Sequence, residues 1–304
     1  MRVVIGGASG LIGSELGRRL EHAGDEVVRL VRHAPLGRGQ VTWQPEAGVL
    51  DPAALAGADA VVNLSGASLS RLPWTPGYRR LIVESRLSAT NTIVHALGEL
   101  HERGERMPAL ISASAVGFYG SRPGEQLDEL SATGTGFLAE LVRRWEDAAA
   151  AAPTRVVFLR TGIVLAGEGA LGPILALAKA GLAGPLGSGR QHWPWISLHD
   201  EVGAVLHAIR SELAGPVNLV APTPATAAEL IRSVARAVHR PYWLPAPAFA
   251  LTTVLGDAAR ELMLADQLVR PAVLTREGFA FRHATADSAI AELLGRPAGT
   301  TYQA

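Results

Sequence analysis

Short apolar runs alternate with longer amphipathic segments through the first two-thirds of the chain. The segments Leu11–His22, Gly77–Glu102 and Phe137–Ala151 carry apolar residues at helical spacing, and shorter runs around them have the composition of strands. Most of these runs are continuously apolar, which is typical of strands buried on both faces. The predicted strands are Arg2–Gly6, Glu26–Arg32, Val41–Trp43, Asp59–Leu64, Ala109–Ser114 and Arg155–Arg160. The pattern predicts an α/β fold with a doubly wound parallel sheet.

The pattern becomes less regular beyond residue 162, where a glycine-rich loop precedes a helix at His199–Leu213 and a strand at Val217–Val220. The next helix has two candidate starts. It begins either at Pro224, capped by Thr223, or after Thr226, with Glu229 completing a capping box. Beyond Pro241 the chain is expected to form a small helical tail. We therefore expect a core (1–161), a mixed, substrate-side region that completes the fold (162–240) and a small helical C-terminal domain (241–304).

The first predicted strand runs directly into a glycine-rich turn, in which Gly7, Gly10 and Gly13 have the spacing Gly-x-x-Gly-x-x-Gly. Such glycines permit a tight turn, a close approach of the backbone to a pyrophosphate, and close packing of the helix on the strand. The N–H groups at the start of the helix then face the phosphates. This context predicts a Rossmann-type dinucleotide site in residues 1–161, and a purely structural turn is the alternative.

The end of the second strand indicates which dinucleotide is bound. An NAD-preferring protein places an acid there to hold the ribose 2′-hydroxyl, but no acid occurs between Glu26 and Glu46. Arg32 occupies this place and can pair with a 2′-phosphate. We therefore expect NADP as the cofactor, with a solvated strand-end arginine as the alternative.

Composition narrows the remaining classes of function. The chain has no cysteine, which removes disulfides, thiol nucleophiles and Cys-ligated metals. Its 28 basic and 28 acidic residues balance, so no nucleic-acid or anionic-membrane footprint is expected. His199 and Asp200 are expected to cap a helix rather than to bind a metal. No targeting or spanning segment is apparent, so we expect a soluble, cytoplasmic protein. We expect its partner to be a small-molecule substrate, and we leave open whether the chain forms a homodimer.

Several further motifs accompany the glycine turn. They are Val62–Gly66, Glu84–Arg86, Ser112–Gly120, Phe137–Leu141 with Trp145-Glu146, Arg160–Gly162 and Gly184–Gln191, with Leu244–Pro247 and Gly278–Phe281 in the tail. Together these motifs resemble an extended short-chain dehydrogenase/reductase, in its atypical nucleoside-diphosphate-sugar epimerase-like branch. The tail resembles the small domain of unknown function that accompanies this branch, and the resemblance covers nearly the whole chain.

The resemblance implies a cofactor lying across the carboxyl ends of the strands. Arg86 flanks the apolar stripe of its helix and needs an anionic partner, which is either the cofactor or a carboxylate such as Glu84. The implied cofactor-binding residues are Gly7, Ser9, Gly10, Leu11, Ile12, Gly13, Val31, Arg32, Leu64, Ser65, Gly66, Arg86 and Val164.

The Tyr-x-x-x-Lys pair that related enzymes use for proton transfer is missing. Lys179 is the only lysine, and none of the four tyrosines has a lysine four residues later. Ser114 matches the family's catalytic serine, whereas Phe137 and Leu141 stand where the tyrosine and lysine should be. The candidate catalytic residues are therefore Ser114 and Tyr119, although Ser114 could instead bond to backbone and Tyr119 could only line or pack the pocket. Glu140 is a further candidate acid.

Aromatic residues make up only 5% of the chain, yet two tryptophans flank one proline in the glycine-rich loop. Aromatic walls with an arginine and an amide suit a planar, partly anionic ligand. The candidate substrate-binding residues are Trp74, Arg190, Gln191, Trp193 and Trp195. Alternatively, the tryptophans of the loop fix it to the core.

Three functions are consistent with these residues. The first is an NADP-dependent oxidoreductase that acts on a small carbonyl, imine or sugar-like substrate, because the hydride chemistry belongs to the cofactor. The second is a non-catalytic NADP sensor or scaffold, since some relatives of this branch are associated with cell or organelle division. The third is a nucleotide-sugar epimerase, which is disfavoured because reversible oxidation of a sugar hydroxyl requires a strong base.

Overall fold

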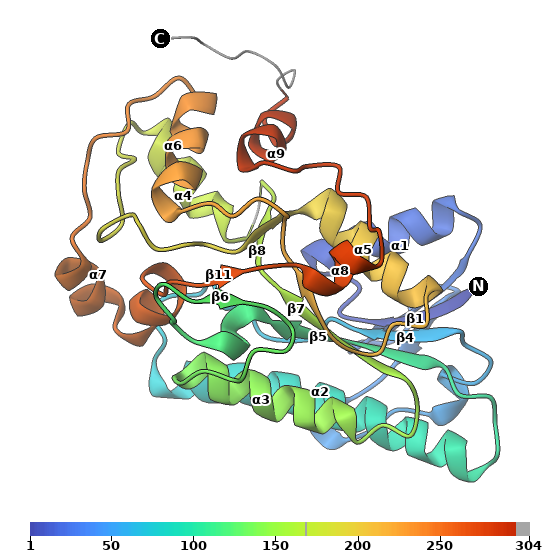
Figure 1. Cartoon of the computed structure of the whole chain (residues 1–304). Helices are drawn as coiled ribbons and strands as arrows, with labels where there is room; N and C mark the ends of the chain where they lie inside the picture. The colour runs from blue at the N-terminus through green and yellow to red at the C-terminus, as the bar shows by residue number, and fades with distance from the viewer. Residues whose placement is uncertain (168, 296–304) are drawn as a thin grey trace.

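The computed structural model describes residues 1–167 and 169–295, and a seven-stranded, wholly parallel sheet lies at its centre (Figure 1). In spatial order its strands are β10 (Gly215–Leu219), β7 (Val156–Thr161), β5 (Ala109–Ala115), β4 (Ala60–Asn63), β1 (Arg2–Gly6), β2 (Glu26–Val31) and β3 (Gln40–Thr42). The predicted Rossmann-type α/β fold is confirmed. For each of the six strands predicted in the first two-thirds of the chain, the predicted first and last residues lie within one residue of the observed bounds.

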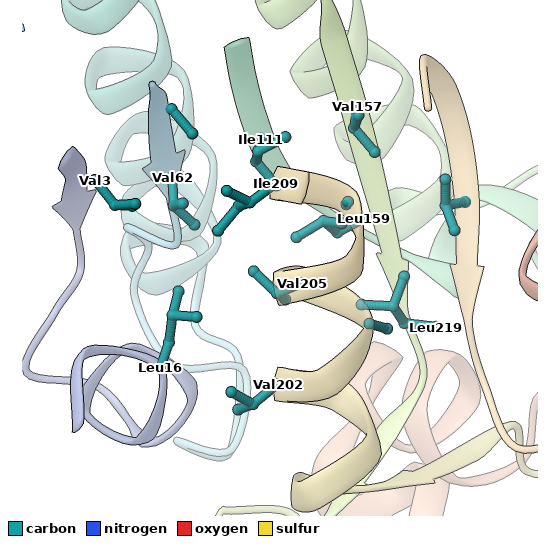
Figure 2. Close-up of a cluster of buried hydrophobic side chains, with 14 of the residues drawn as sticks. Val3, Leu16, Val62, Ile111, Val157, Leu159, Val202, Val205, Ile209 and Leu219 are labelled. Atoms are coloured by element: carbon teal, nitrogen blue, oxygen red, sulfur yellow. The ribbon is translucent and has the colours of Figure 1, made fainter. Parts of the chain in front are cut away.

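Helices cover both faces of the sheet (Figure 1). Helices α1 (Leu11–His22) and α5 (Leu198–Arg210) lie on one face, and α2 (Pro76–Glu102) and α3 (Phe137–Ala150) lie on the other. Figure 2 shows Leu16 of α1 and Val202, Val205 and Ile209 of α5 directed at side chains of the central strands. Successive residues of β1 enter opposite cores, because Val3 and Ile5 pack beneath α1 and α5, whereas Val4 packs beneath α2.

The order of the strands reverses between β1 and β4, so the connections that leave these two strands diverge. In parallel sheets a crevice for ligands opens beyond the carboxyl ends of the strands at such a point. Gly6, Asn63 and Ala115 end three neighbouring strands at this edge. The fold therefore directs the glycine turn and the loops after β4 and β5 toward one place.

The short helices η1 (Pro45–Ala47) and η2 (Pro52–Ala54) pack against α2. The remaining elements follow β5 in the chain. They are the short helix η3 (Val116–Tyr119), the strand pairs β6 (Gln126–Leu127) with β11 (Leu268–Val269) and β8 (Ile163–Leu165) with β9 (Trp195–Ser197), and the helices α4 (Leu171–Lys179), α6 (Ala227–Ala237), α7 (Ala248–Leu255), the π-helical turn η4 (Ala259–Met263), α8 (Ala272–Arg276) and α9 (Ala286–Leu293). The chain beyond Pro241 contains α7, α8 and α9, and β11 pairs with β6. Within the described residues, no helix combines the length and apolarity needed to cross a bilayer.

Helix α6 begins at the second of its two predicted starts. Thr226 caps it, and the Glu229 carboxylate accepts a hydrogen bond from the Thr226 N–H at 2.7 Å. The start at Pro224 is wrong because the residue between Pro224 and Thr226 pairs with the glycine-rich loop instead. The Ala225 carbonyl oxygen accepts from Trp193 N–H at 2.9 Å.

Candidate functional site

The glycine turn after β1 is held against the loop after β4. Gly7 has a φ of +80°, and a Cβ there would lie 2.7 Å from the Leu64 backbone. A Cβ on Gly13 would lie 2.4 Å from the Gly7 carbonyl oxygen. Both positions therefore require glycine, because any side chain would force the strand, turn and helix apart.

Unsatisfied polar groups surround this turn. The first turn of α1 has no side-chain cap and no acidic residue, and Ser9 and Gly10 in front of it are exposed. The Ser65 hydroxyl oxygen is buried without a hydrogen-bond partner. Free N–H groups at a helix start and an orphaned hydroxyl suit the oxygens of a pyrophosphate. The residues present thus fit a dinucleotide cofactor.

Arg32 lies at the end of β2, directly after Val31, with 73% of its side chain exposed. Its guanidinium is 3.6 Å from the exposed Glu46 carboxylate. An exposed pair at this distance contributes little, about 0–1 kcal/mol, so Arg32 is free to exchange that partner for a phosphate.

Arg86 of α2 is buried, and its guanidinium has no carboxylate partner within the described chain. Its Nη1 donates to the Ala67 and Ile82 carbonyl oxygens at 3.1 and 3.0 Å, and the group lies over the Trp145 ring. Glu84 is exposed and does not pair with it. Burial lowers the pKa of Arg86 to about 10. A cation of this kind needs an anionic ligand to offset its desolvation.

A cavity of about 290 Å³ opens between the strand ends and the C-terminal segment. Of the predicted cofactor residues, Ile12, Leu64 and Arg86 line it, while Gly66 packs against the Arg86 side chain, Leu11 begins α1, and Val164 lies in β8. The other lining residues are Leu69, Ala113–Gly117, Leu138, Leu141, Val142, Trp145, Thr161–Ile163, Trp193, Pro194, Glu261, Leu262, Ala265 and Gln267. The wall is mostly apolar, with few convergent polar groups, as is usual for small-molecule sites.

Ser114 lines the cavity and belongs to a buried polar network. Its hydroxyl donates to Glu146 Oε1 at 2.5 Å, and the Glu146 carboxylate forms a two-pronged ion pair with Arg160 at 2.9 and 2.8 Å. The network therefore fixes the position of the Ser114 oxygen at the end of β5.

Tyr119 lies at the far end of the same network and is not among the residues that line the cavity. Its hydroxyl accepts from Arg160 Nη1 at 3.0 Å and donates to Asn218 Oδ1 at 2.7 Å. Burial raises the pKa of Tyr119 to about 12.

Neither Phe137 nor Leu141, the positions where the resemblance places the tyrosine and the lysine, carries a titratable group. Leu141 lines the cavity, and Phe137 packs edge-on against Trp74 with a ring separation of 5.6 Å. Lys179 is the last residue of α4 and lies outside the cavity. Glu140 is exposed and pairs with Arg143.

The predicted substrate residues are divided between the cavity and the packing around it. Trp193 lines the cavity and donates from Nε1 to the Met263 carbonyl oxygen at 3.1 Å. Trp195 is buried in β9, Gln191 is bonded to backbone carbonyls, Arg190 is exposed, and Trp74 lies in a neighbouring apolar cluster, with none of these four lining the cavity.

The sequence did not single out the polar residues that the C-terminal segment adds. Glu261 lines the cavity and accepts from Phe137 N–H at 2.9 Å. Gln267 also lines it and donates to the Val116 and Gly120 carbonyl oxygens. Glu146 and Arg160 stand inside motifs that the sequence did mark, but their pairing becomes visible only in the fold. No group of three or more metal-ligating side chains occurs among the described residues.

Comparisons with known proteins agree with this geometry. A model described as the NAD dependent epimerase/dehydratase family matches residues 3–221, and a domain of unknown function, DUF1731, matches residues 246–293. An epimerase family protein of Mycobacterium bovis is 41% identical over 300 residues, covering 97% of this chain and 98% of its own.

Solved structures are similar over the same length. The human epimerase family protein SDR39U1, crystallised with NADPH, has a TM-score of 0.88 and 32% identity, covering 97% of this chain and 99% of that one. The Thermus thermophilus UDP-glucose 4-epimerase, in complex with NAD, has a TM-score of 0.73 at 19% identity over 97% and 99%, which is a likeness of fold alone. The expected extended short-chain dehydrogenase/reductase-like architecture is confirmed, and the chain belongs to the NAD dependent epimerase/dehydratase family.

Proposed function

We propose that the protein is an NADP-dependent oxidoreductase that transfers a hydride to or from a small substrate. The observation that carries this proposal is the buried Arg86 guanidinium, which lines the cavity. The orphaned Ser65 hydroxyl after β4 and the uncapped start of α1 lie at the same edge of the sheet. Together these groups form a cradle that an anionic dinucleotide would satisfy.

NADP is favoured over NAD by Arg32. It stands at the strand end where a 2′-phosphate would lie, and Glu46, its one ion-pair partner among the described residues, is exposed. The human relative SDR39U1 was crystallised with NADPH, which supports the same preference.

In this proposal, Ser114 and the side chains around it bind and orient the polar part of the substrate. When bound, the nicotinamide cofactor supplies the hydride-transfer chemistry. The Ser114 oxygen accepts a hydrogen bond from the substrate, because its own proton is donated to Glu146, which holds the hydroxyl in position. Tyr119 acts as a positioning residue, because its hydroxyl holds Arg160 and Arg160 in turn holds Glu146.

Titration of cofactor binding tests the proposal. The wild type should bind NADPH more tightly than NADH, and Arg32→Ala should weaken NADPH binding roughly tenfold or more while leaving NADH unchanged, because one charge-assisted contact is lost. Arg38→Ala is the matched control, since Arg38 is exposed in the following loop. Equal affinities of the wild type for NADPH and NADH would refute the NADP assignment.

A non-catalytic NADP sensor is the second candidate, and the observation in its favour is the pair Phe137 and Leu141, which replaces the proton-transfer residues. Stopped-flow oxidation of bound NADPH against carbonyls, imines and sugars separates the two candidates. Tight NADPH binding with no oxidation by any of them would favour the sensor. Turnover of a nucleotide sugar would instead point to an epimerase.

A further inference from the structure

The C-terminal segment closes the cavity opposite the strand ends. Residues at the carboxyl edge of the sheet, such as Ile12 at the start of α1 and Leu64 after β4, form one wall. The other wall is formed by Glu261, Leu262, Ala265 and Gln267. Glu261 also borders a smaller adjoining pocket of about 130 Å³. It is the only acidic side chain among the described residues that line the main cavity.

The Glu261 carboxylate is held firmly in this wall. Its Oε1 and Oε2 accept from the N–H groups of Phe137 and Leu138 at 2.9 and 3.4 Å. A Cβ on Gly136 would lie 2.5 Å from Oε1, so the close approach depends on glycine at that position. A carboxylate can accept about four hydrogen bonds, and these two leave capacity for a ligand.

The charges of the cavity argue against a phosphate-bearing substrate. Arg86 is the only basic side chain in the described lining, and it lies beside the loop after β4, where the proposed cofactor would occupy it. Arg260 borders only the smaller pocket and pairs with Asp257 at 3.1 Å. A nucleotide sugar brings a pyrophosphate that needs several cationic or N–H partners, and here it would meet a carboxylate and apolar side chains.

We infer that the cavity accepts a small, largely apolar iminium ion or the amine formed from it, with Glu261 binding the positively charged nitrogen. The inference rests on the proposed NADP-dependent oxidoreductase function and specifies its substrate class. An iminium nitrogen already carries its proton or alkyl group and its positive charge, so its reduction needs no proton donor. The absence of a tyrosine at Phe137 and of a lysine at Leu141 is compatible with that chemistry.

The step balances without a further reactant. The iminium carbon gains a hydride, and a C–H bond forms as the C=N π bond breaks. The π electrons become the lone pair of the nitrogen, which turns the iminium into a neutral amine, and the nicotinamide of NADPH is oxidised to NADP⁺. The amine takes up a proton from water afterwards, and Glu261 binds the resulting ammonium by the same contact.

Binding of matched ligands to the NADP⁺-saturated protein tests the inference. Calorimetry compares cyclic secondary amines with cyclic alcohols of the same ring size, for the wild type, Glu261→Gln and Glu277→Gln. Glu261→Gln keeps an oxygen that can accept from Phe137 N–H but removes the charge. Glu277 is exposed and outside the cavity, so it controls for loss of one negative charge.

The wild type and Glu277→Gln should bind the amines on the order of tenfold or more tightly than the alcohols, and Glu261→Gln should lose that preference. Steady-state reduction of cyclic imines by NADPH should show a raised KM and a nearly unchanged kcat in Glu261→Gln. Failure of every amine to bind, or an equal loss of amines and alcohols in Glu261→Gln, would overturn the inference.

NADPH titration of the same three proteins keeps this failure separate from failure of the proposed function. If the wild type binds NADPH but shows no preference for amines, only the iminium substrate is refuted. If the wild type does not bind NADPH, both the oxidoreductase function and the iminium substrate are refuted.

Discussion

At the scale of single residues, Glu201 of α5 combines complete burial with a half-satisfied carboxyl group. Its Oε1 accepts from the Thr161 hydroxyl at 2.8 Å, and its Oε2 has no partner. Burial raises the pKa of Glu201 to about 8, because removal from water disfavours the charged form. Glu201 therefore keeps its proton in the folded protein at neutral pH. Its hydrogen-bond partner Thr161 lines the cavity.

This raised pKa predicts how the free energy of unfolding changes with pH. From the unfolded value near 4.5 up to about 8, the folded state holds a proton that the unfolded state has released, so stability falls as the pH rises. The decline approaches about 1.4 kcal/mol per pH unit for one such group. Glu201→Gln should remove it, and urea unfolding across this pH range measures the difference.

The control for this measurement is Glu212→Gln, because Glu212 is exposed just beyond the end of the same helix. The free energy of unfolding of the Glu212→Gln variant should change with pH as that of the wild type does. Parallel curves for the wild type and Glu201→Gln would contradict the prediction.

Individual site residues were predictable from the sequence where chain neighbours determine their role. Gly7 and Gly13 are recognisable because the strand, turn and helix that require them are contiguous in the sequence. Ser114 is recognisable because it lies at the end of the buried strand β5. Nothing near Glu261 in the sequence indicates its role, because its carboxylate accepts a hydrogen bond from the N–H of Phe137, 124 positions away. Only the packing of the tail brings these two residues together.

At the scale of elements, the start of α6 shows how local hydrogen bonds decide between two plausible boundaries. The Thr226 hydroxyl accepts from Glu229 N–H at 3.2 Å, and the Glu229 carboxylate accepts from Thr226 N–H. This reciprocal pair satisfies two donors at the helix start, an arrangement that Thr223 and Pro224 do not offer.

Thr226→Ala should therefore destabilise the protein by about 1 kcal/mol, the usual cost of losing an N-cap hydroxyl. Chemical denaturation measures this difference. Thr275→Ala is the matched control, because Thr275 is exposed within α8 and its hydroxyl makes no hydrogen bond among the described residues. An equal effect of the two substitutions would show that the cap of α6 contributes nothing.

Most long elements could be predicted, whereas the short strands β8 and β9 could not, because a segment of three residues carries no period of its own. The 12 residues of α1 and the buried strands carry their period in their own sequence. Strands β8 and β9 have three residues each and exist because Ile163 and Trp195 are brought into register. Helix α4 was missed for a different reason, since glycine and proline lie near its start.

At the scale of the whole molecule, a buried cluster at the start of α5 fastens the C-terminal segment to the core. Asp200 accepts from the N–H groups of Arg282 and His283 at 2.8 and 3.0 Å, and from the Ser197 hydroxyl at 3.0 Å. The His283 ring Nδ1 lies 3.0 Å from the same hydroxyl. Burial alone would raise the pKa of Asp200, but these hydrogen bonds outweigh it and lower the pKa below its ordinary value.

Asp200→Asn should cost roughly 1–3 kcal/mol of stability at neutral pH, because an amide presents its own N–H groups to donors that need an acceptor. Since the folded pKa is depressed, the contribution of Asp200 is complete above the unfolded pKa of about 3.9 and is lost as the pH falls through the lower, folded value. The gap between wild type and variant should therefore narrow below about pH 4 in urea unfolding.

Asp147→Asn provides the comparison for this substitution, since Asp147 forms an exposed ion pair with Arg143 and should change stability little. A gap between the wild type and Asp200→Asn that stays constant down to acid pH would show that the charge of Asp200 plays no part.

The two walls of the cavity come from parts of the chain that are far apart in sequence. The strand-end wall lies within residues 12–163, together with Trp193 and Pro194, and the facing wall lies within residues 261–267. Substitutions in the second wall can alter which molecule fits without disturbing the glycine turn or Arg86. If the proposed function holds, this arrangement allows related proteins to share one coenzyme while they differ in substrate.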